Sequence, residues 1–485
     1  MKNVYSVALL ATATLFGTGC MVGPKYVKPA FPSPSAFKEA LPPNATNTSD
    51  WKVANPNDQA ERGKWWVIFG DTQLNDLEDQ LTQANQNLQL AEARLRQARA
   101  AIRLTRASEF PSISLSPSIL NERASQNQPY LSPALVNNGT GNFTFPFELS
   151  YEVDLWGRVR RSVNAAKEET QAAAGDVETA KLSLHAELAR DYYGLRSADL
   201  QEQLLGDTVT AYARALKLTE DRYSGGAAPR ADVEQARTQL EAAQVAETDI
   251  VQSRANYEHA IAVLVGKTPA QLTIAPINNF VLRPPSIPVA VAGTLLERRP
   301  DVASAERRVA AANEQIGIAK AAYFPQVTIG AAAGLQSTQA SNWFSWPSRL
   351  WAVGPSVSQV IYDGGRRRAT TEAALANYDA AVALYRQDSL TAFQEVEDNL
   401  IALSVLAKEV EQQSRTTAAA EKTLDLFNRR YQDGVDTYLQ VVTSETTALQ
   451  NERNDIELRR REMDASVLLV KAVGGGWDTS QLPNY

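Results

Sequence analysis

The sequence is poor in the residues that build metal sites and catalytic sites. It contains one cysteine, two histidines and three methionines among 485 residues. A single cysteine excludes a disulfide within the chain, and so few methionines argue against a relay of soft-metal ligands. Because His185 and His259 have no cysteine or carboxylate motif around them, we expect both to be packed or solvated rather than to bind zinc or catalyse. We therefore expect no cofactor and no enzymatic activity.

Long apolar runs and basic clusters are also missing. No stretch of 18 apolar residues occurs, which excludes a helical membrane span but leaves open a β-barrel, whose signal in each strand is much weaker. The net charge is −7, and no cluster of Lys and Arg offers a path for a phosphate backbone. The composition thus argues against a nucleic-acid partner.

The N-terminus carries an export signal. Lys2 precedes an apolar run from Val4 to Phe16, and small residues then lead to Cys20. This arrangement resembles a bacterial lipobox, in which residues 1–19 are the signal peptide and Cys20 is acylated as the first mature residue. Ordinary cleavage after Gly19 would leave the same N-terminus without lipid. We expect Cys20 to be lipidated.

Residues 143–155 alternate between apolar side chains and positions that are polar or, at Pro146, proline. Because side chains alternate faces along a strand, one face would be wholly apolar and the other would carry carboxylates. Strands of soluble sandwiches alternate similarly but usually stop at about 5–6 residues, whereas a tilted strand crossing a bilayer needs about 9–11. We predict that the apolar face meets lipid and the acidic face a wet lumen. The predicted lipid-facing residues are Phe143, Phe145, Phe147, Leu149, Tyr151 and Val153.

The chain repeats its own plan 208 positions later (365 − 157). The matching pairs are Gly157-Arg158 with Gly365-Arg366, Arg222-Tyr223 with Arg430-Tyr431, and Val265-Gly266 with Val473-Gly474. Each repeat is predicted to contain a helix, a β-hairpin, a very long helix, a glycine turn and a returning helix. The proline-free long helices would each span roughly 100 Å.

These patterns divide the chain into segments. Residues 20–72 are predicted to form an N-terminal tether and residues 267–299 a proline-rich connector. Residues 73–266 are the first repeat, with a helix from about Gln73 to Ser108, a hairpin at 110–156 and a tip turn at 223–230. Residues 300–474 are the second repeat, with a hairpin at 324–363 and a tip turn at 431–437. Residues 475–485 are the C-terminal tail.

The two hairpins contribute four strands, which cannot close a barrel by themselves. An open sheet edge is not tolerated in lipid, so several copies must contribute. Two copies would give eight strands and an interior filled by side chains, whereas three would give twelve and leave a lumen. Because the inner face is acidic and rich in serine, we predict a homotrimer with a water-filled pore.

Short motifs follow one another in a fixed order along the mature chain. They are Cys20-Met21-Val22-Gly23-Pro24-Lys25-Tyr26, Trp65-Trp66 with Phe69 and Asp71, Asp154-Leu155-Trp156-Gly157-Arg158, Arg299-Pro300-Asp301 with Ala305-Glu306, Tyr323-Phe324-Pro325, Asp363-Gly364-Gly365-Arg366 and Gly474-Gly475-Gly476-Trp477. In this order they resemble the outer-membrane efflux factors of the TolC superfamily, nearest its lipoprotein branch of the OprM and NodT type.

The resemblance implies an α+β membrane protein of the bacterial outer membrane that extends into the periplasm. A trimeric 12-stranded β-barrel would continue into a long periplasmic α-helical barrel. The region around Trp65, the connector and the tail would form an equatorial girdle. Such a protein is a passive exit duct for drugs or other small molecules. It docks with a periplasmic adaptor (membrane fusion) protein and an inner-membrane pump of the resistance-nodulation-division type. The alternatives are a duct for type I protein secretion and a non-transporting periplasmic coiled coil or adhesin.

The resemblance also implies a gate at the periplasmic tip. Leu439 falls where related proteins narrow the pore, whereas Gln440 and Thr443 stand at positions that are often acidic in those proteins. Asp232 matches a residue that bonds to the tyrosine matching Tyr431. We expect this bond to tie the two tip turns together. The alternative for Asp232 is an acidic residue placed at a helix N-terminus by the helix dipole.

Overall fold

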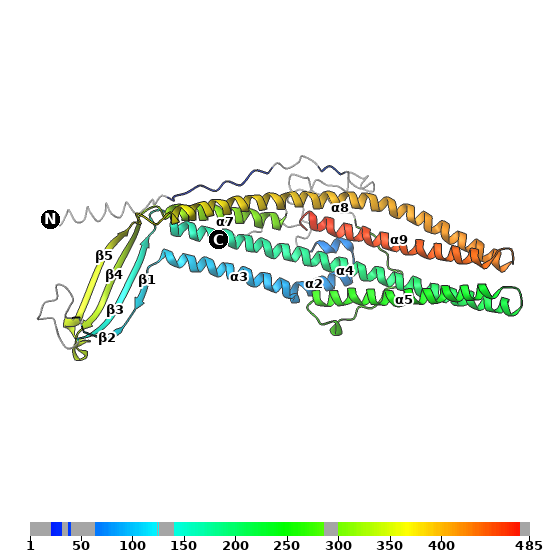
Figure 1. Ribbon diagram of the computed structural model, residues 1–485, viewed down its shortest axis with the longest axis horizontal. Helices are drawn as coiled ribbons and strands as arrows, with labels where there is room; N and C mark the ends of the chain where they lie inside the picture. The colour runs from blue at the N-terminus through cyan, green and yellow to red at the C-terminus, as the bar shows by residue number, and fades with distance from the viewer. Residues whose placement is uncertain are drawn as a thin grey trace.

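The computed structural model describes residues 21–31, 37–39, 64–123, 125, 140–285 and 299–475. A small antiparallel sheet stands at one end of a long helical bundle, and the other end is formed by two helical turns (Figure 1). The predicted signal peptide, Cys20 and residues 476–485 of the predicted tail lie outside the described residues.

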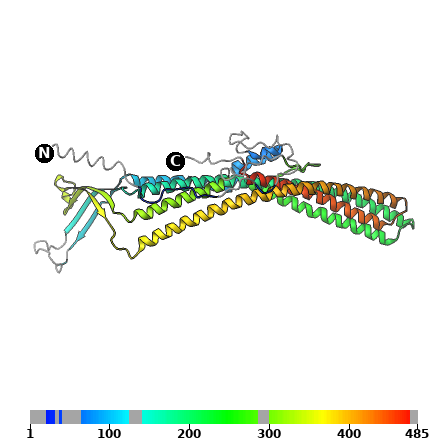
Figure 2. The same cartoon turned by 90° about the horizontal axis from the view of Figure 1, so that it is seen from above.

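Two helical hairpins make up most of the bundle and lie side by side (Figures 1 and 2). The first pairs α4 (Arg158–Ser224) with α5 (Arg230–Leu264), and the second pairs α8 (Arg366–Gln432) with α9 (Tyr438–Ala472). The long helices have 67 residues each and the returning helices 35 each. At about 1.5 Å per residue, α4 and α8 are each roughly 100 Å long.

Local chemistry explains where the long helices begin and end. The Asp154 carboxylate accepts hydrogen bonds from the backbone N–H groups of Val159 and Arg160, which satisfies donors in the first turn of α4. Gly226 and Gly434 have positive φ values of 72° and 75° in the tip turns, a conformation that favours glycine. Both turns fall within the predicted ranges 223–230 and 431–437. In the described part of the chain, no helix combines the length and the apolar character that crossing a membrane requires.

The predicted single helix over 73–108 is wrong. The structure has α2 (Thr72–Ala84) and α3 (Gln86–Arg106), followed by a 3-10 turn, η3 (Ala107–Glu109). Asn85 separates the helices with an extended backbone (φ −66°, ψ 125°). Its Oδ1 accepts from the Leu88 N–H at 3.0 Å and so caps α3, while its Nδ2 donates to the Leu264 carbonyl at 2.8 Å. The break is therefore held by the end of α5.

Asn85→Ala is expected to lower the free energy of unfolding by about 2 kcal/mol, because α3 loses its cap and the Leu264 carbonyl loses a donor. The measurement is the thermal midpoint of the detergent-solubilised protein. Asn87→Ala, at an exposed position two residues further along α3, is the matched control and should leave the midpoint unchanged. Equal midpoints for the two variants would show that Asn85 does not hold the break.

The sheet contains β1 (Ser112–Leu115), β2 (Ser118–Glu122), β3 (Thr140–Val153), β4 (Gln326–Ser337) and β5 (Arg349–Ser358), in the order β1-β3-β4-β5 with β2 also pairing β3. The first predicted strand is thus two segments. Leu115 lies opposite Phe147 and Ser118 opposite Thr144, so the register is continuous across the interruption. Pro117 has no N–H to donate to the ladder, which explains the gap in pairing.

The main core lies midway along the bundle, where the N-terminal elements pack on α4. The 3-10 helix η2 (Trp65–Phe69) buries Trp65 and Trp66, and the Trp66 ring stacks on His185 at a centroid distance of 4.2 Å. The Tyr192 hydroxyl donates to Asp71 at 2.7 Å. A further helix, α7 (Pro300–Ala321), packs between α4 and α8 nearer the sheet.

Candidate functional site: the two-faced sheet and the helical tip

The sheet has one apolar face and one polar face. Residues directly opposite each other in an antiparallel pair project from the same side, so the register assigns each side chain to a face. All six residues predicted to face lipid lie on the apolar side. The other apolar residues on this side are Ile113, Leu115, Ile119, Val327, Ile329, Ala331, Ala333, Leu335, Trp351, Val353, Pro355 and Val357. The polar residues Asn121, Ser337 and Arg349 lie on the same side, at the end of the sheet away from the helices.

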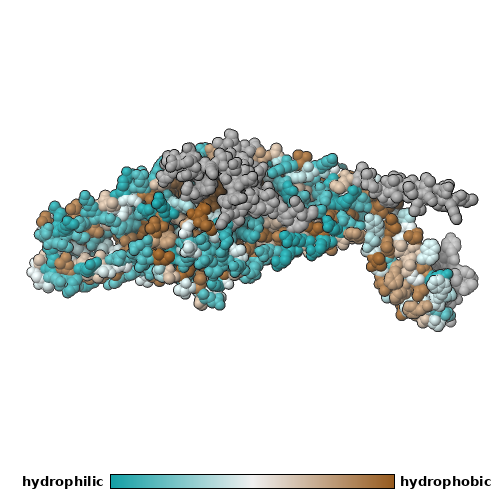
Figure 3. Space-filling model, turned by 180° about the vertical axis from the view of Figure 1, so that it is seen from behind, coloured by the Kyte–Doolittle hydropathy of each residue, from teal (hydrophilic) through white to brown (hydrophobic). Residues whose placement is uncertain are grey.

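The opposite face carries hydroxyl, amide and carboxylate groups between small residues. Its polar members are Ser112, Ser114, Ser118, Glu122, Thr140, Asn142, Thr144, Glu148, Ser150, Glu152, Gln326, Thr328, Gln336, Ser356 and Ser358. Leu120 and Leu350 are large apolar exceptions on this side. Gly330, Gly334 and Gly354 lie between them. A face of this kind favours contact with water, while the apolar face has no covering layer in the described chain. Figure 3 shows apolar residues predominating over the sheet and hydrophilic residues over the far end of the helices.

Both edges of the sheet are open within the described chain. β1 pairs only with β3, and β5 pairs only with β4. Large apolar side chains on the apolar face are strongly exposed, among them Trp351 at 75% and Ile113 at 70%. Unpaired edges and exposed apolar surface are liabilities for a lone soluble sheet. The arrangement is suited to a closed assembly in an apolar solvent.

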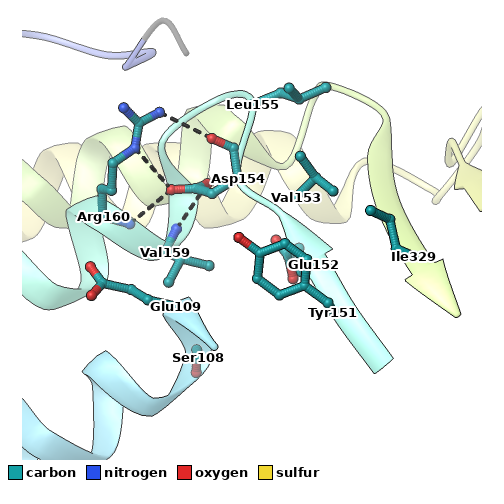
Figure 4. Close-up of a pocket in the computed structure, with 10 residues that line it drawn as sticks. All are labelled: Ser108, Glu109, Tyr151, Glu152, Val153, Asp154, Leu155, Val159, Arg160 and Ile329. Carbon is teal, nitrogen blue, oxygen red and sulfur yellow. Dashed lines mark hydrogen bonds and ion pairs between the residues drawn. The ribbon is translucent and has the colours of Figure 1, made fainter. Parts of the chain in front are cut away.

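The junction of sheet and helices forms a pocket of about 610 Å³ (Figure 4). Tyr151, Val153 and Ile329 line it from the apolar face. Next to them, toward the start of α4, the carboxylate of Asp154 accepts from the Arg160 side chain at 3.2 Å. Beside that pair, Arg158 binds both oxygens of Glu152. Charged pairs therefore lie directly at the end of the strand, where its apolar face ends and α4 begins.

Aromatic rings lie at the same junction between the sheet and the helices. Trp156 stacks on Phe324 with a centroid distance of 4.7 Å, and its indole N–H donates to the Pro325 carbonyl at 2.8 Å. Such amphipathic rings are typical of a membrane–water boundary. The N-terminal segment reaches this level too, since Val22 N–H donates to the Trp156 carbonyl at 3.0 Å.

At the tip, the predicted bond between Asp232 and Tyr431 is wrong within the protomer. The Tyr431 hydroxyl is buried and has no hydrogen-bond partner among the described residues. Its ring packs instead beside Tyr438, at a centroid distance of 5.3 Å. Arg222 covers the ring, with its guanidinium carbon 4.4 Å from the centroid. Burial raises the pKa of Asp232, and the charge of Arg222 opposes that rise.

The other three predicted gate residues lie together on the exposed face of α9. Leu439 is 54% exposed, and Gln440 and Thr443 are exposed beside it. The Thr443 hydroxyl donates to the Leu439 carbonyl at 2.9 Å, so it is used within its own helix. These side chains meet no other helix of the described chain that would cover them, and a constriction formed by them requires neighbouring copies.

One buried carboxylate and one partly buried carboxylate on α9 were not predicted. Glu445 is only 6% exposed and faces Tyr212 of α4, and its Oε2 lacks a hydrogen-bond partner among the described residues. Burial raises its pKa to about 7. Burial and then the neighbouring Glu421 of α8 raise the pKa of Glu452 to about 7 as well. Nothing in the local sequence of α9 marks these positions, because their burial comes from α4 and α8.

A buried histidine–glutamate pair was also missed. His185 Nδ1 lies 2.5 Å from Glu78 Oε2, and both side chains are buried. Burial raises the pKa of Glu78 well above its usual range and lowers the pKa of His185 to about 4. These shifts favour a protonated, neutral Glu78 and a neutral His185 that share a hydrogen bond, with the His185 ring stacked on Trp66. Among the described residues, no group of three or more His, Cys, Asp or Glu side chains could hold a metal ion.

Comparisons with known proteins identify the family that shares this architecture. The profile of a family described as "Outer membrane efflux protein" matches residues 77–267 and 291–475. The toluene efflux pump outer membrane protein TtgF of Pseudomonas putida is 30% identical over 99% of this chain and 98% of its own length. The solved structure of the outer-membrane channel OprN is 29% identical with a TM-score of 0.84, covering 94% of this chain and all of that one. The Campylobacter jejuni CmeC channel shares the fold at 22% identity, with a TM-score of 0.86 over 95% and 96% of the two chains. The chain belongs to the outer membrane efflux protein family.

Proposed function

We propose that this protein is the outer-membrane channel of a tripartite efflux system, a passive exit duct for small molecules. The observation that carries the proposal is the two-faced sheet with open edges at the end of helices roughly 100 Å long. A sheet that is apolar outside and polar inside suits a membrane pore. The hydrophilic helical arm continues that pore away from the membrane.

The pore is proposed to be a homotrimeric 12-stranded barrel built from an internally duplicated chain. Each chain supplies four strand positions, and β5 of one copy would pair with β1 of the next, which closes every edge. Twelve strands leave a lumen, into which the polar face with its glycines and serines would project. Equal lengths of α4 and α8, and of α5 and α9, support the duplication.

The proposed protein partners follow from the position of the helical tip, at the end of the duct that lies away from the membrane. The helical tip would meet a periplasmic adaptor protein that connects it to an inner-membrane pump, proposed to be of the resistance-nodulation-division type. The exported compounds are proposed to be small organic molecules, since relatives carry the names of toluene and antibiotic efflux proteins. Gln440 and Thr443 would line the narrowing formed by Leu439 without fixed charge, so this constriction would not concentrate cations.

Planar bilayer recording tests the duct. Purified full-length protein should give discrete single-channel currents, and expression with a matching pump and adaptor should lower the susceptibility of a channel-deficient strain to small antibiotics. A protein that inserts as trimers yet never conducts would refute the duct and favour a structural role. Conduction without any change in drug susceptibility, but with export of a polypeptide, would favour a type I secretion duct.

Lipidation at Cys20 is a separate part of the proposal. Met21, the next residue, packs so closely on Gly157 that a Cβ there would lie 2.7 Å from the Met21 Cγ, and Gly157 has a φ of 78°. Met21 is thus held at the junction of strand and helix, at the level of the aromatic rings. Acyl chains attached to the preceding residue would start at the membrane surface.

Cys20→Ser is expected to abolish metabolic labelling with a palmitate analogue. The variant should still fractionate with the outer membrane, because a closed barrel buries far more apolar surface than acyl chains, which contribute about 0.8 kcal/mol per CH₂. The measurement is in-gel detection of the label in isolated membranes. Absence of label on the unaltered protein would refute lipidation and leave the duct untouched.

A further inference from the structure

The pocket at the junction of the sheet and the helices is lined differently on its two sides (Figure 4). Toward the sheet, Tyr151 and Ile329 present apolar surface that continues the apolar face. Toward the helices, Glu109 and the pair of Asp154 and Arg160 present charged groups. Binding pockets of this kind combine an apolar wall with a few polar groups that orient the ligand. An apolar wall that passes directly into charged groups matches the two parts of a phospholipid, its acyl chains and its headgroup.

The charges at this pocket balance one another. Three carboxylates at the pocket each lie beside one arginine. The pairs are Glu109 with Arg106, Glu152 with Arg158, and Asp154 with Arg160. An anionic ligand would meet the three carboxylates, and a cationic ligand would meet the three guanidinium groups. A zwitterionic headgroup, with one phosphate and one amine, can place each of its charges beside a group of opposite sign.

Glu109 is the carboxylate of the pocket that is most open to a ligand. Its Oε2 lies 3.9 Å from the Arg106 Nε, beyond hydrogen-bond distance, and its side chain is 35% exposed. Glu152 and Asp154 are less exposed. Arg158 donates to both oxygens of Glu152, and Asp154 accepts from the first turn of α4. A primary ammonium group has three N–H donors and could bind Glu109 without breaking a hydrogen bond that the structure shows.

Arg160 is the cation that lines the pocket. Its side chain is 38% exposed although it donates to the carboxylate and to the carbonyl of Asp154. A guanidinium group has five N–H donors and suits phosphate oxygens, so it can bind a phosphate beside Asp154. In Figure 4 the side chains of Glu109 and Arg160 lie on the same side of the Tyr151 ring. The acceptor for an amine and the donor for a phosphate thus belong to one pocket.

The second repeat differs at the matching position, which predicts one site in each chain. Phe110 matches Phe324 at an offset of 214 (324 − 110), so Glu109 matches Tyr323. The guanidinium carbon of Arg367 lies 5.4 Å from the centroid of the Tyr323 ring. An aromatic ring covered by a cation therefore stands where the first repeat has a carboxylate.

We propose that the junction pocket binds one phospholipid with a zwitterionic headgroup that carries a primary amine, of the phosphatidylethanolamine class. Glu109 binds the ammonium group, Arg160 binds the phosphate, and an acyl chain lies against Tyr151 and Ile329. The proposal rests on the sheet lying in the membrane, which is part of the proposed function. The lipid comes from the leaflet nearer the helices and fills the space where η3, β3 and α4 meet.

Lipid binding by the purified full-length protein tests the site. The protein in mild detergent is mixed with phosphatidylethanolamine, phosphatidylcholine or phosphatidylglycerol of the same acyl composition, and bound lipids are counted by native mass spectrometry. Wild type is expected to retain one phosphatidylethanolamine per chain and to bind it about tenfold more tightly than the other two lipids. The choline headgroup has no N–H donor for Glu109, and the glycerol headgroup has no positive charge.

Two variants change the pocket and a third is the matched control. Glu109→Gln keeps the size of the side chain but removes its charge, so binding of phosphatidylethanolamine should fall about tenfold and the headgroup preference should disappear. Ile329→Trp fills space at the apolar wall and should lower the retention of all three lipids. Glu92→Gln removes a carboxylate at an exposed position of α3 that does not line the pocket, and it should bind as wild type does.

The outcomes separate the lipid site from the duct. Equal binding of the three lipids by wild type refutes the site, and so does unchanged binding in Glu109→Gln or an equal loss in Glu92→Gln. Binding by Cys20→Ser alone also refutes it, because the chain's own acyl groups would then occupy the pocket. Selective binding by a protein that never conducts supports the site and refutes the duct, whereas conduction without selective binding refutes the site and supports the duct.

Discussion

Replacing Phe147 by arginine is expected to destabilise the membrane-inserted protein by about 2–4 kcal/mol in each protomer, the cost of a charged side chain near the bilayer midplane. Phe147 lies near the middle of β3, opposite Leu115 on one side and Ala333 on the other, and is 49% exposed on the apolar face. In a closed barrel this side chain would face lipid. In the proposed trimer, three such charges around one barrel should largely prevent assembly.

Ser150→Arg is the matched control on the other face of the same strand. Ser150 lies opposite Ser112 and Gly330, where no bulky side chain fills the space. Its arginine would reach water, so trimer yield and heat stability should stay near wild type while ion selectivity shifts toward anions. The measurement is the fraction of heat-resistant trimer in outer-membrane extracts. Equal loss for the two variants would mean that the faces do not meet lipid and water as assigned.

The second large effect concerns pH. The pKa of Glu445 in the fold is about 7, above its usual value of 4.5, because burial penalises the charged form. A raised pKa of an acid means that its contribution to stability is fully present below about pH 4.5 and is lost as the pH rises through 7. A shift of this size corresponds to roughly 3 kcal/mol. We expect α9 to loosen from α4 in the tip half of the bundle at alkaline pH.

Glu445→Gln should remove most of this dependence, since glutamine stays neutral and keeps the shape of the protonated acid. The half-exposed Glu452, close to Glu421, accounts for the remainder. The measurement is hydrogen exchange of the backbone amides of 441–448 at about pH 6 and about pH 8.5, corrected for intrinsic rates. Glu241→Gln, at an exposed position of α5, should lose protection with pH as wild type does. An unchanged pH dependence in Glu445→Gln would show that another group controls the loosening.

Patterns that recur along the chain predicted most of the fold. The alternation from Phe143 onward was sufficient to assign the faces of β3, because the strand pleat is a local property. The offset of 208 located the second tip turn from the first. The length of the proline-free helices then predicted how far both turns lie from the sheet. The order of short motifs then identified the family, which the comparisons confirm.

Contacts between distant segments could not be predicted in the same way. The break at Asn85 depends on the Leu264 carbonyl, 179 residues away, so the run of helical residues looked continuous. Glu78 and His185 meet across 107 positions without a shared motif. The tip shows a different failure. Sequence placed Asp232 and Tyr431 at neighbouring turns, but the side-chain conformation that turns Tyr431 inward depends on the cluster around it.

The unequal lengths of paired helices have a mechanical consequence. α4 lies against α3 nearer the sheet and against α5 beyond it, and α8 lies in the same way against α7 and then α9. Each long helix therefore continues without a break past the point where one short neighbouring helix ends and the next one begins. Bending or pulling loads between the membrane and the far end must pass through α4 and α8, while the short helices can shift at their ends without severing any backbone hydrogen bond of the long ones. α4 and α8 thus connect the sheet to the tip turns without a break in their backbone hydrogen bonds.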